Sequence, residues 1–275
     1  MIQNKYKILD FIGKGNFGSV FLGENIHNSG EKVAIKLEKK NGISILKNET
    51  RVLEYLARNG CRTQIPQVFW FGLQEENHCL IMTYFVGKTI MDIHDKSVVN
   101  QWMVSALGIM EKIHSYGVIH RDLKPAHFIF VEDKQKWILI DFGFSTFYLE
   151  GFSEKQEYII GTPNYISLNI HNGMKYKPID DIWSLLYIYI RYLYPELFSF
   201  SSNTKDNNYP TNYPTNHILN SENQIRKEKK ELWNTFDFWE KKIYNSLQIL
   251  LDNTYKIPPY KLLIDIFTKP EEPKV

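Results

Sequence analysis

The chain has 275 residues, which suits one large domain or two modest lobes that share a cleft. Apolar residues make up 43% of it, and with a charged fraction of 23% this composition excludes a disordered polyelectrolyte. The 33 basic residues nearly match the 31 acidic ones, so the net charge of +2 gives no support for nonspecific binding to nucleic acid.

The cysteines and the apolar stretches bear on the compartment. Cys61 and Cys79 lack metal-ligand spacing and are too few for a disulfide framework, which predicts a reducing compartment, the cytoplasm. The first residues lack the apolar core of a signal peptide, and the most apolar run, residues 182–190, is too short to span a bilayer. We expect a monomer with no membrane partner and a buried helix at 182–190.

The first part of the chain predicts a sheet. Residues 6–12, 19–23 and 32–37 alternate as antiparallel strands do, with glycines and the turn at 27–30 between them. Apolar positions at helical spacing predict a helix over 44–59, and two further apolar runs at 67–73 and 78–85 predict strands. Residues 1–86 should therefore form a lobe with a five-stranded antiparallel sheet and one helix.

From residue 87 the pattern becomes helical. Long helices are predicted over 98–116 and from 177 onward, with later ones at 222–234, 237–251 and 259–268. Residues 201–220 are polar and contain the tandem repeat Tyr-Pro-Thr-Asn at 209–216, which excludes a helix or a central strand and predicts an exposed loop. Residues 87–275 thus form a mostly helical lobe, and the chain as a whole is of the α+β class.

Glycines stand between the first two predicted strands. Gly13, Gly15 and Gly18, followed by Val20, form the pattern GxGxxGxV, in which backbone N–H groups can approach phosphate oxygens without a Cβ in the way. An ordinary hairpin turn would explain these glycines about equally well. A strand rather than a helix follows the third glycine, which argues against a dinucleotide site.

Three further motifs carry charged groups. Lys36 ends Val-Ala-Ile-Lys on the third strand, where its ammonium group can hold nucleotide phosphates, and Glu49 on the helix can pair with it. His-Arg-Asp-Leu-Lys-Pro at 120–125 and Asp-Phe-Gly at 141–143 each follow a short apolar strand. Their order and separation suit a catalytic base and a metal-binding carboxylate that meet in one cleft.

With these motifs the sequence resembles the eukaryotic protein kinases over nearly its whole length. Within them it is most similar to the casein kinase 1 group, with the vaccinia-type kinases as related neighbours. The narrower likeness is carried by IPQVFWFG at 65–72, GTPNYISLN at 161–169 and DDIWSL at 180–185. The resemblance implies the two-lobed protein kinase fold, ATP as cosubstrate, and protein substrates with Ser or Thr hydroxyls.

The resemblance also implies roles for single residues. Asp122 would accept the proton of the substrate hydroxyl, Lys124 would neutralise charge on the transferred group, and Thr162 would bond Asp122. Asp141 would bind Mg²⁺. The remaining roles concern ATP. Lys36 would pair with Glu49 and contact phosphates under the loop of Gly13, Gly15 and Gly18. Thr83 would be the gatekeeper, and Tyr84 and Val86 would bond adenine. The adenine ring would lie between two sets of apolar side chains, with Ile12, Val20 and Ala34 on one side and Phe128 or Ile140 on the other.

One position departs from the family pattern. His127 stands where the catalytic loop of kinases has an asparagine that holds a second metal ion. An imidazole nitrogen suits Mn²⁺ better than Mg²⁺. Three interpretations remain open: an active kinase in which His127 binds Mn²⁺ or nothing, a nucleotide-binding pseudokinase that serves as a scaffold, and a small-molecule phosphotransferase. The retained lysines and carboxylates favour activity, because a scaffold has no chemical need for the full set.

A second departure concerns the substrate. Casein kinase 1 enzymes carry an arginine pair before the two aspartates, used for acidic or phosphorylated substrates, and here Pro178 and Ile179 occupy those positions. A patch of this kind could be rebuilt by Lys175, Lys177 and the cluster Arg226, Lys227, Lys229 and Lys230, although a helical charge run is more often a solvated face. Little alanine beside much Asn, Ile, Lys and Tyr suggests an AT-rich genome, parasitic or viral, and a viral protein would act in the host cytoplasm or the virion.

Overall fold

The computed structural model describes residues 1–14, 18–28, 30–40, 44–148, 158–196, 212–214, 220–233, 241–251 and 257–269. The chain divides into two compact units. The first unit comprises Met1–Gly87 and Ile129–Ser145, and the second comprises Lys88–Phe128 and Thr146–Val275. The first break falls next to the boundary predicted between residues 86 and 87. Residues 129–145, expected in the helical lobe, group with the sheet instead.

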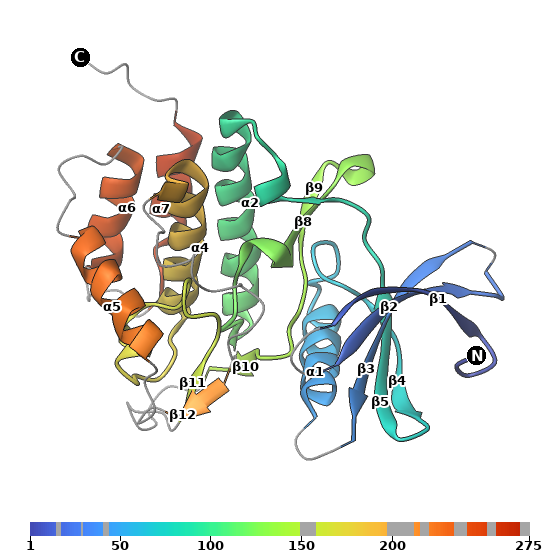
Figure 1. The fold of residues 1–275 in the computed structure, drawn as a ribbon. Coiled ribbons are helices and arrows are strands. Elements are labelled where there is room, and N and C mark those ends of the chain that lie inside the picture. The colour runs from blue at the N-terminus through green and yellow to red at the C-terminus, as the bar shows by residue number, and fades with distance from the viewer. Residues whose placement is uncertain are drawn as a thin grey trace. The chain divides into compact units, whose positions relative to one another are not determined.

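The first unit is built on the predicted five-stranded antiparallel sheet (Figure 1). Its strands follow the order β1-β2-β3-β5-β4, and every neighbouring pair is antiparallel. The strands are β1 (Tyr6–Lys14), β2 (Ser19–Asn25), β3 (Lys32–Lys39), β4 (Val68–Gln74) and β5 (Asn77–Thr83). The three alternating segments and the two apolar runs of the sequence therefore predicted the number and direction of these strands correctly.

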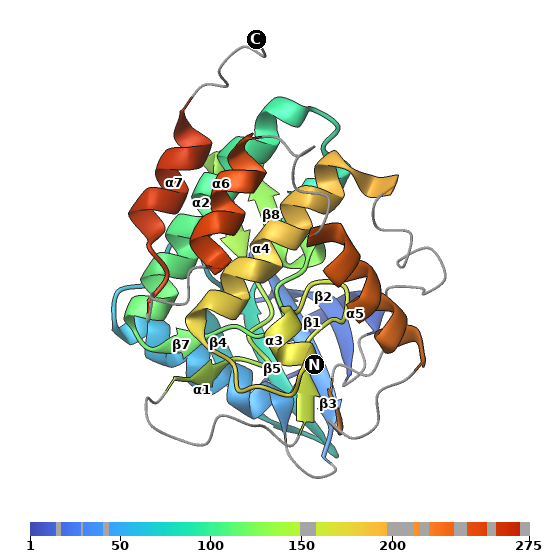
Figure 2. The ribbon, with the colours of Figure 1, turned by 90° about the vertical axis from the view of Figure 1, so that its left-hand side faces the viewer.

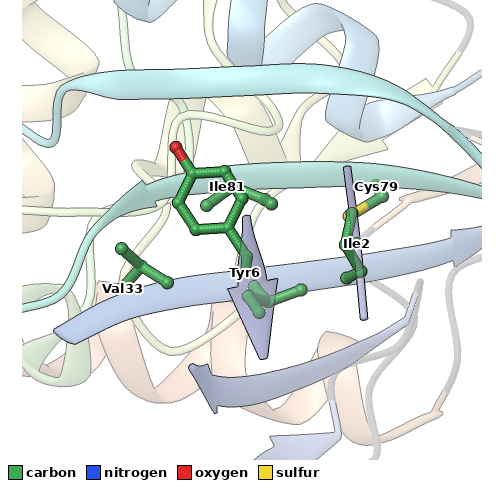
Figure 3. Close-up of a cluster of buried hydrophobic side chains, with 6 residues drawn as sticks. Ile2, Tyr6, Val33, Cys79 and Ile81 are labelled. Atoms are coloured by element: carbon green, nitrogen blue, oxygen red, sulfur yellow. The ribbon is translucent and has the colours of Figure 1, made fainter. Parts of the chain in front are cut away.

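One face of this sheet carries a small apolar core. Figure 3 shows its side chains gathered over strands β3 and β5 and the N-terminal residues, and its members are Ile2, Tyr6, Val33, Ile35, Cys79 and Ile81. Successive side chains of a strand point to opposite faces. Since Val33 and Ile35 belong to the core, Ala34 and Lys36 point to the other face. That second face is where the candidate site of this unit lies.

Helix α1 (Ile45–Arg58) is held at its N-terminus by two oxygen acceptors. The hydroxyl of Ser44 accepts a hydrogen bond from the amide of Lys47, and the buried carboxylate of Glu38 accepts one from the amide of Ile45 at 2.9 Å. Both acceptors satisfy amides that have no partner within the helix, and negative charge at this end is favourable. The apolar stripe of Leu46, Val52, Leu53 and Leu56 is buried, and the helix contacts β3, β4 and β5.

Strands β8 (Phe128–Val131) and β9 (Lys136–Leu139) are neighbours in one sheet, with the turn η3 (Glu132–Lys134) between them. Two contacts explain why residues 129–145 belong to the first unit. The amide of Leu139 donates to the carbonyl of Gln64 at 2.9 Å, and residues after β9 hydrogen-bond to helix α1. Such long-range contacts are not visible in a local hydrophobic pattern.

The second unit is mostly helical, as predicted. Contacts connect α2 (Lys96–Ser115) with α4 (Pro178–Leu193) and α7 (Tyr260–Thr268), and α6 (Lys241–Leu251) with α4 and α7 (Figure 2). Residues 182–190 are buried within α4, which confirms that prediction. No helix in the described part of the chain has the length and apolar character needed to cross a lipid bilayer. The remaining elements of this unit are β6 (Lys88–Thr89), η1 (Ile90–Asp92), β7 (Val118–Ile119), η2 (Pro125–His127), β10 (Thr146–Phe147), β11 (Tyr158–Ile160), α3 (Leu168–His171), β12 (Asn212–Pro214) and α5 (Asn220–Trp233).

The tandem repeat contains a short strand where a loop was expected. Asn212–Pro214 forms β12, which pairs antiparallel with β11, so the prediction of a loop was wrong for these three residues. A proline is tolerated here because both strands of a two-stranded sheet are edges. The pairing joins residues more than fifty positions apart, which a local reading misses. The other residues of the repeat lie outside the described part of the chain.

Candidate active site

In the first unit, three charged side chains meet on the face of the sheet opposite the core of Figure 3. The ammonium group of Lys36 on β3 lies 2.8 and 2.9 Å from the two carboxylate oxygens of Glu49 on α1. It also lies 3.2 Å from Oδ1 of Asp141, which follows β9. The predicted pairing of Lys36 with Glu49 is thus present, and the structure adds Asp141 to the same cation.

The charges of this group reinforce the lysine. Burial alone would lower the pKa of Lys36, but the carboxylates of Asp141 and Glu49 outweigh it and raise that pKa above its usual value. Lys36 therefore remains a cation at any physiological pH. Burial and the neighbouring charge of Asp141 raise the pKa of Glu49, against the lowering effect of Lys36. The two carboxylates repel each other, and Lys36 holds them together.

Asp141 is the exposed member of the group, with 41% of its side chain accessible, against 1% for Glu49. Its backbone is left-handed, with φ of 66°, a conformation that Asp adopts more readily than most residues. The next amide, that of the buried Phe142, donates to Oε1 of Glu49 at 3.3 Å. This bond attaches the residue after Asp141 to Glu49 on helix α1.

These residues fit a phosphate-bound metal ion better than a site made of protein ligands alone. No cluster of three or more His, Cys, Asp or Glu side chains suitable for a metal occurs among the described residues. Mg²⁺ is commonly held by one or two carboxylates together with substrate phosphates and water. A carboxylate beside a lysine cation matches that arrangement, with Asp141 for the metal and Lys36 for phosphate oxygens.

The strand register decides which apolar side chains share the face of Lys36. Residues directly opposite each other in antiparallel strands point to the same face. Val20 is paired with Lys36, and Met82 is paired with Ala34, so these residues share the face predicted to bind adenine. Thr83, the predicted gatekeeper, is paired with Val33 on the core side, and its hydroxyl accepts a hydrogen bond from the amide of Gln67 at 3.0 Å. The register therefore places Met82, rather than Thr83, beside Ala34.

The remaining residues predicted to contact ATP are only partly described. Gly18 needs to be glycine, because a Cβ there would lie 2.0 Å from the carbonyl oxygen of Leu37, whereas Gly13 has open space around it. Gly15 lies outside the described residues. Ile12 and Val86 are exposed, Tyr84 and Ile140 partly exposed.

Phe128 was predicted to lie under the adenine ring, but it is fully buried in the second unit. Its ring packs edge-on against Trp102, with centroids 5.4 Å apart. The neighbouring Ile129 belongs to the first unit, is partly exposed and lies against Gly87, where a Cβ would meet its Cγ2 at 2.7 Å. Side chains alternate along a strand, so Phe128 and Ile129 point to opposite faces. Ile129 rather than Phe128 is therefore the residue that lies beside Gly87, just after the predicted adenine-binding residues.

In the second unit, the carboxylate of Asp122 is held between two polar side chains. The hydroxyl of Thr162 donates to Oδ1 of Asp122 at 2.6 Å, and the ammonium group of Lys124 lies 3.7 Å from Oδ2. Asp122 itself is almost wholly buried, while 29% of the Lys124 side chain is accessible. The three residues predicted as catalytic are thus brought together, although Thr162 lies forty positions from Asp122.

The backbone before Asp122 is strained, and the carboxylate of Asp181 binds its amides. Arg121 has φ of 70°, a left-handed conformation that costs energy in a residue with a long side chain. The carboxylate of Asp181 accepts from the amides of His120 at 2.7 Å and Arg121 at 2.9 Å, and Nε2 of His114 lies 2.9 Å away. Burial alone would raise the pKa of Asp181, but His114 and His120 lower it below its usual value.

Tyr176 joins this loop to the segment that carries Thr162. Its hydroxyl contacts the carbonyl oxygens of Arg121 at 3.0 Å and Ile160 at 2.7 Å. Gly161 has φ of +107°, and a Cβ there would lie 2.4 Å from the carbonyl oxygen of Arg121. Sequence reasoning did not single out Tyr176 or Gly161 for this function, because their partners are distant in the chain.

Comparison with known proteins assigns the family. Residues 6–261 match the protein kinase domain family, and this match covers more than nine-tenths of the chain. The chain belongs to the protein kinase domain family. The charged groups around Lys36 and around Asp122 are therefore those of a kinase domain, and the predicted fold is confirmed.

Two curated relatives of this kinase domain are casein kinase I homologs. It is 33% identical over 212 residues to casein kinase I homolog 2 of Saccharomyces cerevisiae, an alignment that covers 70% of this chain and 38% of the relative. It is 31% identical over 206 residues to casein kinase I homolog 1 of Schizosaccharomyces pombe, with 68% and 45% covered. The chain thus matches less than half the length of each relative. The expected similarity to the casein kinase 1 group is confirmed.

His127, which departs from the kinase pattern, is bound to the loop of Asp122. Its Nδ1 lies 2.8 Å from the carbonyl oxygen of Asp122, and the side chain is almost fully buried. A carbonyl oxygen can only accept, so Nδ1 carries the proton and the lone pair of the neutral ring is on Nε2. His127 therefore stabilises the catalytic loop through one nitrogen, while the other has the chemistry of a metal ligand.

Lys229 on α5 is a buried cation that sequence reasoning placed on a solvated face, and that prediction was wrong. Its ammonium group donates to the carbonyl oxygens of Pro163 at 2.7 Å and Ile166 at 2.6 Å, and lies 4.3 Å from the ring centroid of Tyr187. Nε2 of His171 is 3.2 Å away; burial and the cation hold the pKa of His171 well below its usual value. Lys229 thus fixes the segment that carries Thr162.

Proposed function

We propose that this chain is an ATP-dependent protein serine/threonine kinase similar to casein kinase I. The observation that carries the proposal is the environment of Asp122, whose carboxylate is bonded by Thr162 and faced by the Lys124 cation. A general base needs a fixed carboxylate within reach of the hydroxyl proton. A lysine two residues further on neutralises charge that develops on the transferred phosphoryl group.

The first unit supplies the groups that would bind ATP. Lys36, held by Glu49, would contact the phosphates, and Asp141 would hold Mg²⁺ or Mn²⁺ against phosphate oxygens. When bound, the metal ion neutralises negative charge on the phosphates. Val20, Ala34 and Met82 form the apolar surface for the adenine ring, and the backbone of Tyr84 and Val86 would bond its edge.

The chemical step then uses groups of the second unit. Asp122 accepts the proton of a Ser or Thr hydroxyl as the hydroxyl oxygen attacks the γ-phosphorus, and ADP leaves. Thr162 orients the carboxylate through its short hydrogen bond, and Asp181 holds the backbone of the loop. Protein substrates, a monomeric state, a cytoplasmic location and the absence of nucleic-acid and membrane partners stay predictions.

A phosphotransfer assay tests this function. Incubation of the chain with γ-labelled ATP and casein, with Mg²⁺ and Mn²⁺ in parallel, should transfer label to serine and threonine, as phosphoamino-acid analysis would show. Label on tyrosine alone would contradict the specificity. If the chain binds ATP with either metal yet transfers no label to casein or to a panel of Ser/Thr peptides, the nucleotide-binding pseudokinase is the better interpretation.

The substituted position His127 gives a second prediction. If Nε2 of His127 acts as a ligand, Mn²⁺ should support about tenfold higher kcat than Mg²⁺, because nitrogen donors suit manganese better. His127→Asn should shift the preference toward Mg²⁺ by restoring an oxygen donor that can also bond the Asp122 carbonyl through its amide group. The measurement is the ratio of kcat with the two metals in each protein. An unchanged ratio in two active proteins would show that His127 only stabilises the loop.

A further inference from the structure

The side chain of Asn48 on helix α1 hydrogen-bonds to the backbone that follows Asp141. The Nδ2 amide group of Asn48 donates two hydrogen bonds, to the carbonyl oxygens of Gly143 and Ser145, both at 2.9 Å. Asn48 directly precedes Glu49, the partner of Lys36. One turn of the helix thus carries both the carboxylate that holds Lys36 and the amide that holds the segment after Asp141.

The chemistry of the partners fixes the orientation of this amide. Carbonyl oxygens can only accept, so the NH₂ end of Asn48 must face Gly143 and Ser145. The other end is consistent with this, because Oδ1 of Asn48 accepts from Arg51 at 3.0 Å. An amide supplies two donors in one plane. A carboxylate in the same place would set an acceptor against two acceptors, and an apolar side chain would leave the carbonyls without these donors.

Three neighbouring contacts make the attachment specific. Oε1 of Glu49 accepts from the amide of Phe142, and the amide of Ser145 donates to the carbonyl of Phe142 at 3.0 Å, which closes a turn. Ile45 packs so closely against Gly143 that a Cβ there would lie 2.6 Å from Cγ2 of Ile45. The helix therefore binds three backbone polar groups of residues 142–145, and Asn48 provides two of those bonds.

We propose that Asn48 is a positioning residue that keeps helix α1 and the segment of Asp141 together, so that Lys36, Glu49 and Asp141 stay within bonding distance. The need for such a device follows from the charges, since the carboxylates of Glu49 and Asp141 repel each other. A neutral double donor opposes that separation without adding charge. The inference rests on the proposed function for the roles of Lys36 and Asp141 toward ATP.

The test compares Asn48→Ala and Asn48→Asp with Lys47→Ala, an exposed neighbour on the same helix, as the matched control. Hydrogen exchange of residues 141–148 is measured without ligand, with the core residues 79–82 of β5 as an internal reference. Exchange in 141–148 should be about tenfold faster in Asn48→Ala and faster still in Asn48→Asp, because local opening exposes this segment. The reference residues and the Lys47→Ala protein should be unchanged.

Binding measurements separate positioning from a general structural role. Asn48→Ala should weaken the affinity for ATP with Mg²⁺ about tenfold, since Lys36 and Asp141 act on phosphate and metal. The affinity for adenosine, which reaches neither group, should stay within about twofold. Equal losses for both ligands, or exchange that is unchanged in 141–148, would overturn the proposal. A wild type that binds ATP but transfers no phosphate would refute the kinase function alone, whereas the exchange result still decides the role of Asn48.

Discussion

Asp122→Asn is expected to lower kcat for peptide phosphorylation about 10³-fold while leaving the affinity for ATP within about twofold. The side chain keeps its shape, and its oxygen can still accept the hydrogen bond from Thr162. It can no longer accept the substrate proton, and the Lys124 cation loses its counter-charge. Steady-state kinetics with a Ser-containing peptide and equilibrium binding of ATP would measure the two quantities separately.

The control for this variant is Asp133→Asn, which removes the same charge at an exposed turn. That protein should behave like the wild type in both measurements. Thermal unfolding of Asp122→Asn is needed as well, because Asp122 is nearly buried and its loss could disturb the loop. A folded variant with wild-type kcat would refute the role of Asp122 as the base.

Lys36→Met should lower kcat/KM about 10²-fold or more, because it removes the cation expected to contact the phosphates. Glu49→Gln should act in the same direction with a smaller loss, about tenfold, by releasing Lys36 from its bonds at 2.8 and 2.9 Å. The double variant should lose little more than Lys36→Met alone. Groups that act as a unit are not additive, since removal of one already abolishes the contribution of the other.

A suitable control for the lysine is Lys32→Met on the same strand. Lys32 forms an exposed ion pair with Glu24 at 3.3 Å, and such surface pairs contribute little. Its kinetics should match those of the wild type. If the losses of Lys36→Met and Glu49→Gln instead multiply in the double variant, the two residues act independently and the ion pair is not what positions the phosphates.

Much of the fold could be predicted because its signals are local. Period-two alternation marks the first three strands and continuous apolar runs mark the other two, while the limits of α1 follow from Ser44 as its N-cap and from the apolar stripe behind it. The group around Lys36 was predictable for a related reason. The lysine comes from a strand and Glu49 from the helix of the same unit, so the expected pair needed few long-range contacts.

Errors arose where one position along a strand decides the face. Thr83 and Met82 are neighbours, yet the register with β3 places them on opposite faces of the sheet. Phe128 and Ile129 are likewise neighbours on β8 whose side chains point in opposite directions. A shift of one residue reverses every side chain, and composition does not reveal the register. Lys229 was misjudged for a different reason. The carbonyl oxygens that bind it lie more than sixty residues earlier, so no local pattern distinguishes it from its exposed neighbour Lys227.

The close approach of Gly161 to Arg121 restricts which residue position 161 can hold. A methyl group at position 161 would meet the Arg121 carbonyl at 2.4 Å and Cγ2 of Ile166 at 2.7 Å, in a backbone region that L-residues rarely adopt. Two independent penalties therefore act against every replacement there. Position 161 therefore requires glycine, and this glycine sets how closely the segment that carries Thr162 can approach the loop of Asp122.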